Sequence, residues 1–385
     1  DAEHNEVWPG GRTNHYWFDL NRDWLLAINP ESQGKLAWYH QWYPNVVTDF
    51  HEMGTQSTYF FEPMKPNGSL DPIMPKDNYV KLNNLFATYF SKGLDSIGSL
   101  YFTKEAFDGT YPGYGSSYPD LQGGLGLLFE QASSRGLKQK TKYGYITFPF
   151  TIRNQFISSL ATVQAAVENK SLLRKYQQDF FKSAIERSAK SKIKAYDFSE
   201  RDQNRNKAFI DKLLRHKIHL VKTGEHAYSV PVQQPQYRMV QTFFETYASY
   251  RDSVYYDASA WSVANFYNIK YSTSAKVKEG TTITSTDALI ELEPLTLSSY
   301  AYAIDAKDYN LPAFIHNAQQ HKIVLAAAFK PFMAKNNRSF SYGSLMIPVA
   351  SQTLSEKELY TRLQKLQDQH KIQIHSLSTG FSTKG

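Results

Sequence analysis

A chain of 385 residues with 41% hydrophobic and 15% aromatic residues has room for two globular domains, and this composition excludes a disordered or fibrous protein. It contains no cysteine, which excludes disulfide bonds, thiolate metal ligands and a cysteine nucleophile. The net charge of +7 is too small and too dispersed for a nucleic-acid-binding surface, and no apolar run approaches the roughly 18 residues of a transmembrane helix.

The first clear elements are a helix followed by a strand. Pro30, at a first helical position, predicts a short helix that ends before Pro44. The β-branched run Val46–Phe50 then predicts a strand that delivers His51 to the rim of a sheet, and Gly54 allows the chain to turn. Neutral imidazole is the commonest protein ligand of zinc, so His51 is a candidate metal ligand.

Further elements follow in α/β order. The stretch Ser57–Phe61 follows His51, and a strand is expected at Ser99–Thr103. Asp77 can cap a helix between them, in which apolar residues recur at helical spacing. A turn-rich loop at 108–124 leads to the buried strand Leu125–Phe129, at whose end Glu130 stands.

A long helical pattern begins near Ile152, with an apolar stripe on one face, and continues into a basic tail. The stripe consists of Phe156, Leu160, Val163 and Val167. We place a domain boundary after this tail, which gives domains at 1–192 and 193–385. The second domain contains an internal repeat of strand, helix, strand, strand, beginning at Ala195 and again at Tyr300.

Several residues near the predicted strand ends of the first domain have complementary chemistry. Arg22 is a planar cation suited to binding a carboxylate, and Asn21 can add hydrogen bonds. His51 can hold a metal, and Glu130 could act as general base on a metal-bound water. Arg12 could polarise a carbonyl and stabilise its oxyanion.

These segments resemble the zinc carboxypeptidases (funnelins) over roughly residues 1–190. Asp19–Trp24 is similar to the family's Asp-x-Asn-Arg-Asn-(Phe/Trp) motif, and Asp49–His51 resembles the strand of its third zinc ligand. The tyrosine-rich loop that begins at Tyr111, followed by Phe129–Glu130, resembles its mobile loop and catalytic strand. The resemblance implies a mixed-sheet α/β/α domain that hydrolyses C-terminal residues from peptides, with one zinc ion.

The same resemblance implies roles for individual residues. His51 would be the third zinc ligand, and Glu130 would be the base that also passes a proton to the leaving amine. Asn21 and Arg22 would bind the terminal carboxylate, while Arg12 would polarise the scissile carbonyl. Tyr111 best matches the tyrosine that closes over substrate, with Tyr114 and Tyr118 as rivals.

One element of the family pattern is missing. The family's first two zinc ligands come from a His-x-x-Glu motif upstream of the Asn-Arg pair, and no such motif occurs in this chain. His4 and Glu6 have the wrong spacing. The chain is therefore expected to be the C-terminal portion of an incomplete catalytic domain. The alternative is a non-catalytic peptide- or glycan-binding protein on a decayed peptidase scaffold.

Other interpretations remain open. Arg22 could pair structurally with Asp19 or Asp23, and a hydrolase using Ser116 or Ser117 lacks any paired His-Asp signal. His216, His219 and His321 are expected at sheet edges.

The second domain more weakly resembles the class I glutamine amidotransferase-like domain that is fused to bacterial carboxypeptidases of this kind. The residues that carry this likeness are Tyr256–Trp261 and Gly343–Pro348. Because the chain has no cysteine nucleophile, we expect an accessory role for this domain. The resemblance also implies a secreted or periplasmic location, whereas the oligomeric state cannot be read from the sequence.

Overall fold

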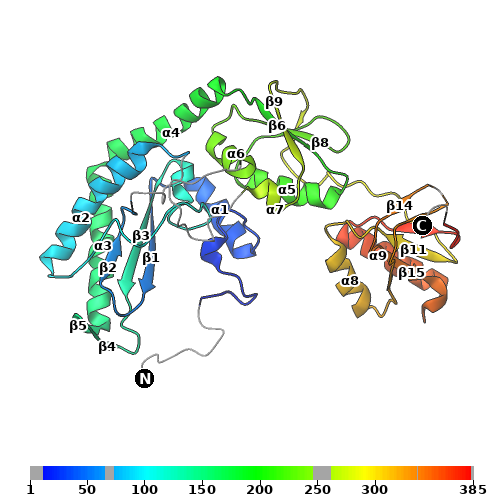
Figure 1. Ribbon diagram of the computed structural model, residues 1–385, viewed down its shortest axis with the longest axis horizontal. Helices are drawn as coiled ribbons and strands as arrows, with labels where there is room; N and C mark the ends of the chain where they lie inside the picture. Colours follow the sequence, from blue (N-terminus) through cyan, green and yellow to red (C-terminus); the bar gives the residue numbers. More distant parts are fainter. Residues whose placement is uncertain (1–11, 66–72, 246–261, 336, 383–385) are drawn as a thin grey trace.

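A computed structural model of the chain describes residues 12–65, 73–245, 262–335 and 337–382. It is a mixed α/β protein with several small sheets (Figure 1). The expected carboxypeptidase-like arrangement of the first half remains a proposal.

The first sheet has three strands in the order β1-β3-β2. β1 (Val46–Met53) and β3 (Leu125–Ala132) are parallel, and β2 (Tyr59–Phe61) is antiparallel to β3. Both main strands were predicted, but each continues past the expected end, so His51 and Glu130 lie within strands. Phe50 of β1 stacks on Phe129 of β3, with 4.5 Å between the ring centroids. This aromatic contact joins the two strands on one face of the sheet.

Helices lie around this sheet, and the first two were predicted from the sequence: one from a proline at its start and one from its apolar spacing. α1 (Pro30–Trp42) begins with proline in its first turn, as predicted, and ends at Tyr43 in the left-handed conformation. α2 (Asn83–Ser96) follows a π-helical turn, η2 (Asn78–Leu82). The remaining elements of this half are the hairpin β4 (Lys138–Thr141) and β5 (Gly144–Thr147), and the long helices α3 (Phe148–Glu168) and α4 (Lys170–Lys190).

Three local predictions were wrong. Ser99–Thr103 is not a strand; Phe102 only forms an isolated bridge with Phe60. Asp77 makes no capping hydrogen bond, because it already has helical backbone angles and pairs with Lys81 instead. His216 lies at no sheet edge: it is fully buried at the C-terminal end of a helix.

The predicted apolar stripe of α3 lies on one face, but that face is exposed. Phe156, Leu160, Val163 and Val167 keep 51–64% of their accessible surface, and Ile152 keeps 51%. The helix instead buries a face of small and polar side chains: Thr151, Asn154, Ser158, Ala161, Thr162 and Ala165.

The second half contains two units with the same topology. The first consists of β6 (Ala195–Ser199), α5 (Gln203–Arg215), β7 (Val221–Lys222), β8 (Ala227–Pro231), α6 (Tyr237–Phe244), α7 (Val263–Phe266), β9 (Tyr271–Ser274) and the added strand β10 (Thr281–Thr282). The second consists of β11 (Ala301–Ile304), α8 (Leu311–Gln320), β12 (Ala326–Ala327), β13 (Phe332–Met333), β14 (Ser339–Phe340), β15 (Leu345–Pro348), α9 (Glu356–His370) and β16 (His375–Leu377).

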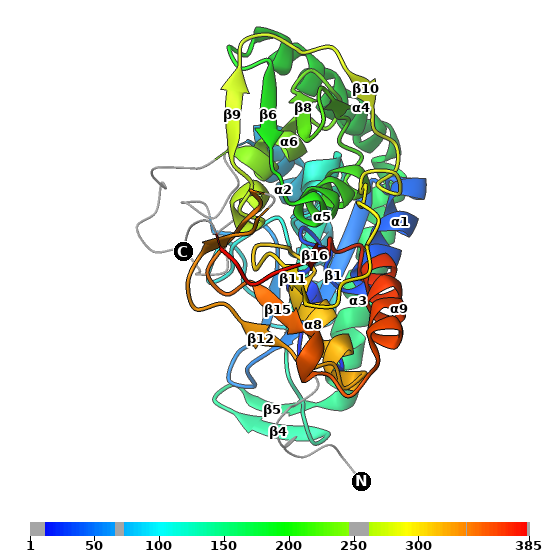
Figure 2. The ribbon, with the colours of Figure 1, turned by 90° about the vertical axis from the view of Figure 1, so that its right-hand side faces the viewer.

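The strand orders confirm the internal repeat and extend it. The first sheet of the repeat runs β10-β7-β8-β6-β9 and the second runs β12-β15-β11-β16, with antiparallel neighbours throughout. Figure 2 shows β9, β6 and β8 side by side. Each unit is therefore strand-helix-strand-strand-helix-strand with its fourth strand beside its first, which is the order of the ferredoxin-like split βαβ arrangement. Tyr256–Trp261, part of the amidotransferase likeness, lies outside the described residues.

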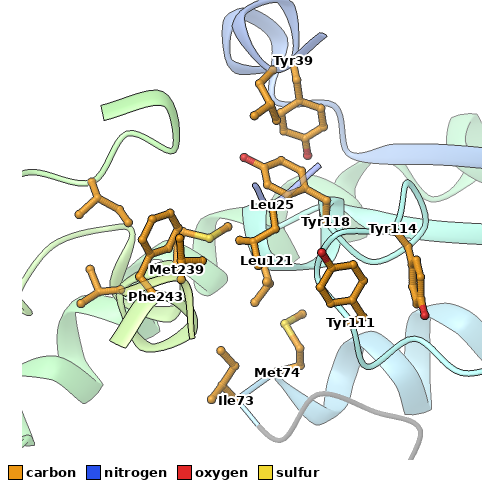
Figure 3. Close-up of a cluster of buried hydrophobic side chains, with 14 of the residues drawn as sticks. Leu25, Tyr39, Ile73, Met74, Tyr111, Tyr114, Tyr118, Leu121, Met239 and Phe243 are labelled. Carbon is orange, nitrogen blue, oxygen red and sulfur yellow. The ribbon is translucent and has the colours of Figure 1, made fainter. Parts of the chain in front are cut away.

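The buried side chains show which parts pack together. One hydrophobic cluster runs from Leu25 to Leu289, so the first repeat unit shares a core with the first sheet and its helices. Figure 3 shows Leu25, Tyr118 and Leu121 beside Met239 and Phe243 of α6. The second unit has its own core, from Leu295 to Ile374. The hydrophobic core is thus continuous across residue 192.

Candidate active site

The site begins with the register of two parallel strands. His51 of β1 lies directly opposite Glu130 of β3, so the two side chains emerge side by side on one face of the sheet. Phe50 and Phe129 point to the other face and hold it in the core. This register places the two predicted residues, His51 and Glu130, next to each other.

A carboxylate two residues before His51 orients its ring. Asp49 lies on the same face of β1, and its Oδ1 is 2.7 Å from His51 Nε2. Asn21 Nδ2 lies 2.8 Å from the same nitrogen. When Nε2 carries the proton of a neutral ring, it donates to Asp49, and Nδ1 keeps the lone pair. Metal-binding histidines commonly use this arrangement. We missed Asp49 at the sequence level, although the spacing of two residues on a strand was a usable signal.

Arg22 ends a short 3₁₀ turn, η1 (Leu20–Arg22), and Arg12 lies upstream of this turn. Asp19 caps it by accepting from the Asn21 backbone N–H, and it also accepts from Arg12 Nε at 2.8 Å. The Arg22 guanidinium lies over the Tyr114 ring, 4.5 Å from its centroid, and 3.9 Å from Asp19. The structural ion pair with Asp19 is thus present but long, and Arg22 still lines the pocket.

The loop after residue 108 closes against this turn. Gly115 N–H donates to Asn21 Oδ1 at 2.7 Å, and a Cβ on Gly115 would lie 2.9 Å from Asp49 Oδ2, which favours glycine there. Asn21 Nδ2 in turn donates to Asp49 Oδ2. Asn21 therefore holds the loop and the carboxylate partner of His51 in place, which is a positioning role alongside any contact with a ligand.

The two candidate tyrosines differ in position. Tyr114 lines the pocket. Tyr111 lies behind Arg22, where its hydroxyl donates to the Arg22 carbonyl at 2.9 Å and burial raises its pKa to about 12. Tyr114 therefore forms part of the pocket wall, whereas Tyr111 supports the backbone of Arg22 from behind.

These segments enclose a pocket of about 360 Å³. Six of the seven predicted site residues line it: Arg12, Asn21, Arg22, His51, Tyr114 and Glu130. The lining residues that we did not assign to the site are Asp49, Ala106, Phe107, Asp108, Ser116 and Leu128. Four stretches that are distant in sequence thus meet at one point.

The surroundings in the pocket raise the pKa values of both Glu130 and His51. Burial raises the pKa of Glu130 to about 7, with the neighbouring His51 and the two arginines acting in the opposite direction. The hydrogen bond to Asp49 raises the pKa of His51. A carboxylate that titrates near neutrality in a cleft is suited to accepting and returning a proton.

The described residues do not complete a metal centre. Within 12–65, 73–245, 262–335 and 337–382, no group of three or more His, Asp or Glu side chains is arranged to hold a metal ion. His51, with its oriented ring, fits one ligand position of a zinc site. His4 and Glu6 lie outside the described residues.

A serine-based site is not assembled here either. Ser116 lines the pocket that holds Asp49 and His51, but no hydrogen bond joins it to the ring among the described residues. The Ser117 hydroxyl is buried without a hydrogen-bond partner. The triad geometry, in which the nucleophile bonds to the base, is therefore absent from this part of the chain.

A larger and more open hollow, of about 940 Å³, lies between α4 and the first repeat unit. Arg174, Lys175 and Lys217 line it together with Tyr43 and Phe181, and no carboxylate lines it. Among the described residues, its lining thus lacks the histidine and carboxylates of the smaller pocket. The smaller pocket is the candidate active site, because it combines cations, a histidine and carboxylates.

Comparison with known proteins gives no match: no family model, no curated protein and no solved structure is similar to this chain. Among the described residues, no helix has the length and hydropathy needed to span a bilayer.

Proposed function

We propose that this pocket is the carboxylate-recognition and catalytic part of a zinc metallocarboxypeptidase site that removes C-terminal residues from peptides. The observation that supports it is the convergence of Arg12, Arg22, His51 and Glu130 in one pocket from three separate stretches of the chain. Their order along the chain is the order of the family motifs that they resemble.

The residues of this chain would divide the work by charge and position. Arg22, supported by Tyr114, binds the terminal carboxylate of the peptide, since a planar guanidinium can bind it through two parallel hydrogen bonds. Arg12 lies at the mouth, where it stabilises a developing oxyanion. Glu130, with its pKa near 7, accepts a proton from water and returns it to the leaving amine.

His51 would hold the metal through Nδ1, with Asp49 fixing the ring. Zinc, when bound, would supply Lewis-acid polarisation. Catalytic zinc sites generally use three protein ligands, so we propose that two more come from a segment upstream of Asp1. β1 is an edge strand of its sheet among the described residues, so its outer edge pairs with no strand there.

The recognition step can be tested on the chain as it is. Calorimetry should show that an N-acylated dipeptide with a free carboxylate binds, and that its C-terminal amide binds at least tenfold more weakly. Arg22→Gln should remove this difference, while the exposed control Arg201→Gln should keep it. Equal binding of acid and amide by the unaltered chain would contradict the proposed carboxylate pocket.

The catalytic step needs a chain that carries its upstream segment and zinc. Glu130→Gln should then reduce turnover by several orders of magnitude without reducing zinc content, since a proton acceptor is lost and a ligand is not. If the unaltered extended chain binds the dipeptide and zinc but does not hydrolyse it, the protein is the non-catalytic peptide-binding alternative. Full activity of Glu130→Gln would refute the assignment of the base.

A further inference from the structure

The large apolar side chains of α3 lie on its solvent-exposed face, and not on the face that packs against the rest of the chain. Its inward face is small and polar: Asn154 donates to Gln131 of β3, and the Ser158 hydroxyl is buried without a hydrogen-bond partner. Its outward face holds the exposed stripe, which we define as Ile152, Phe156, Leu160, Val163 and Val167. An amphipathic helix normally buries its apolar face, so this stripe indicates a surface that another molecule covers.

The geometry of the stripe indicates a helical partner. At 100° per residue, the five side chains lie within about 80° of one another around the helix. They face almost directly away from the residues that contact the sheet. From Phe156 to Val167 the spacing of four, three and four residues is that of a coiled-coil seam, into which a second helix packs at a shallow angle, and Ile152 extends the stripe by one further turn.

The charges beside the stripe indicate which helix packs there. Arg153 and Glu168 are both exposed and lie on the same side of the stripe, near its two ends. Leu160 is midway between them. A two-fold axis at Leu160 would set two copies of α3 antiparallel and bring Arg153 of each copy within about one residue of Glu168 of the other.

A parallel pair would instead keep Arg153 of one copy about 15 residues, or roughly 22 Å, along the seam from Glu168 of the other, so these two side chains could not pair. The Glu168 carboxylate accepts from Tyr89 and Gln164 through different oxygens, and a carboxylate has lone pairs for further donors. It can therefore accept a guanidinium without losing those contacts.

We propose that the chain forms a two-fold symmetric dimer through the α3 stripe, with the helices antiparallel and Arg153 paired with Glu168 of the second copy. This inference does not depend on the proposed function, because the stripe contains none of the pocket residues.

Sedimentation of the 385-residue chain from about 1 to about 200 µM tests the dimer. The unaltered chain should show a monomer–dimer equilibrium, and Val163→Asp should raise the dissociation constant at least tenfold. Val80→Asp is the matched control, since Val80 is 62% exposed and Val163 is 61% exposed. It should leave the equilibrium unchanged. A chain that is monomeric throughout, or a Val163→Asp variant that still dimerises, would overturn the proposal.

Charge reversal tests the antiparallel arrangement independently of the apolar seam. Arg153→Glu and Glu168→Arg should each weaken the dimer at least tenfold, because each change creates two like-charge contacts across the axis. The double reversal should recover the original constant to within about threefold. Near-ultraviolet circular dichroism of every variant checks that the monomer keeps its fold. Failure of the double reversal to recover a dimer would refute this pairing.

Discussion

Removing the Tyr118 hydroxyl should destabilise the protein by more than its single oxygen suggests. Tyr118 is fully buried, and its hydroxyl lies 2.8 Å from His216 Nδ1 and 3.0 Å from His40 Nε2. His216 Nε2 is 2.7 Å from the Leu25 carbonyl, which can only accept. The protons are therefore ordered: His216 donates to Leu25, Tyr118 donates to His216, and His40 donates to Tyr118.

Tyr118→Phe would leave His216 Nδ1 without a donor and the His40 N–H without an acceptor. Both rings are buried, and each orphaned group costs about 1–3 kcal/mol, so we expect a loss of about 2–6 kcal/mol. Urea denaturation near neutral pH measures this loss. Tyr143→Phe is the control, because Tyr143 is 53% exposed. A loss below about 0.5 kcal/mol for Tyr118→Phe would refute the ordered chain.

Three further predictions concern protonation and packing. Burial lowers the pKa of His216 to about 3 and that of His40 to about 4, so ring-proton NMR should show both neutral at about pH 5. Because the unfolded rings take up protons below about 6.5, their contribution to stability is complete above that pH and falls as the pH drops towards 4 and 3. Gly126→Ala should cost more than about 3 kcal/mol by urea denaturation, since its Cβ would lie 1.7 Å from the Ser116 carbonyl oxygen. For an extended, zinc-loaded chain, kcat/KM should rise with pH to a plateau above about 7 as Glu130 ionises, and an unchanged rate between pH 5 and 8 would contradict this role.

The sequence allowed the two central strands and their meeting to be predicted, because short buried apolar runs that end in polar residues have few alternatives in an α/β protein. It did not show that Asp49 orients His51, although alternation along a strand puts both side chains on one face. Nor did it separate Tyr111 from Tyr114, because the loop's path depends on contacts with the Arg22 turn that are distant in sequence.

The α3 stripe shows a more general limit. Periodicity identifies which face of a helix is apolar, but not which face the rest of the fold covers. Phe156 and Val163 follow the expected spacing and are nevertheless exposed, while Asn154 on the other face is buried. Which face is buried depends on how all the elements pack together, and in the single chain their packing leaves the apolar face of α3 exposed to solvent.

The continuous core changes how the second half relates to the pocket. The turn that carries Arg22 runs on into Leu25 and Ala27, whose carbonyls accept hydrogen bonds from His216 and Lys212 at the C-terminal end of α5. Both of these side chains belong to the first ferredoxin-like unit and are buried. A chain cut at residue 192 would leave the two carbonyls without their donors and expose one side of Tyr118. The first unit is therefore part of the scaffold that positions Arg22, whereas the second unit has a separate core.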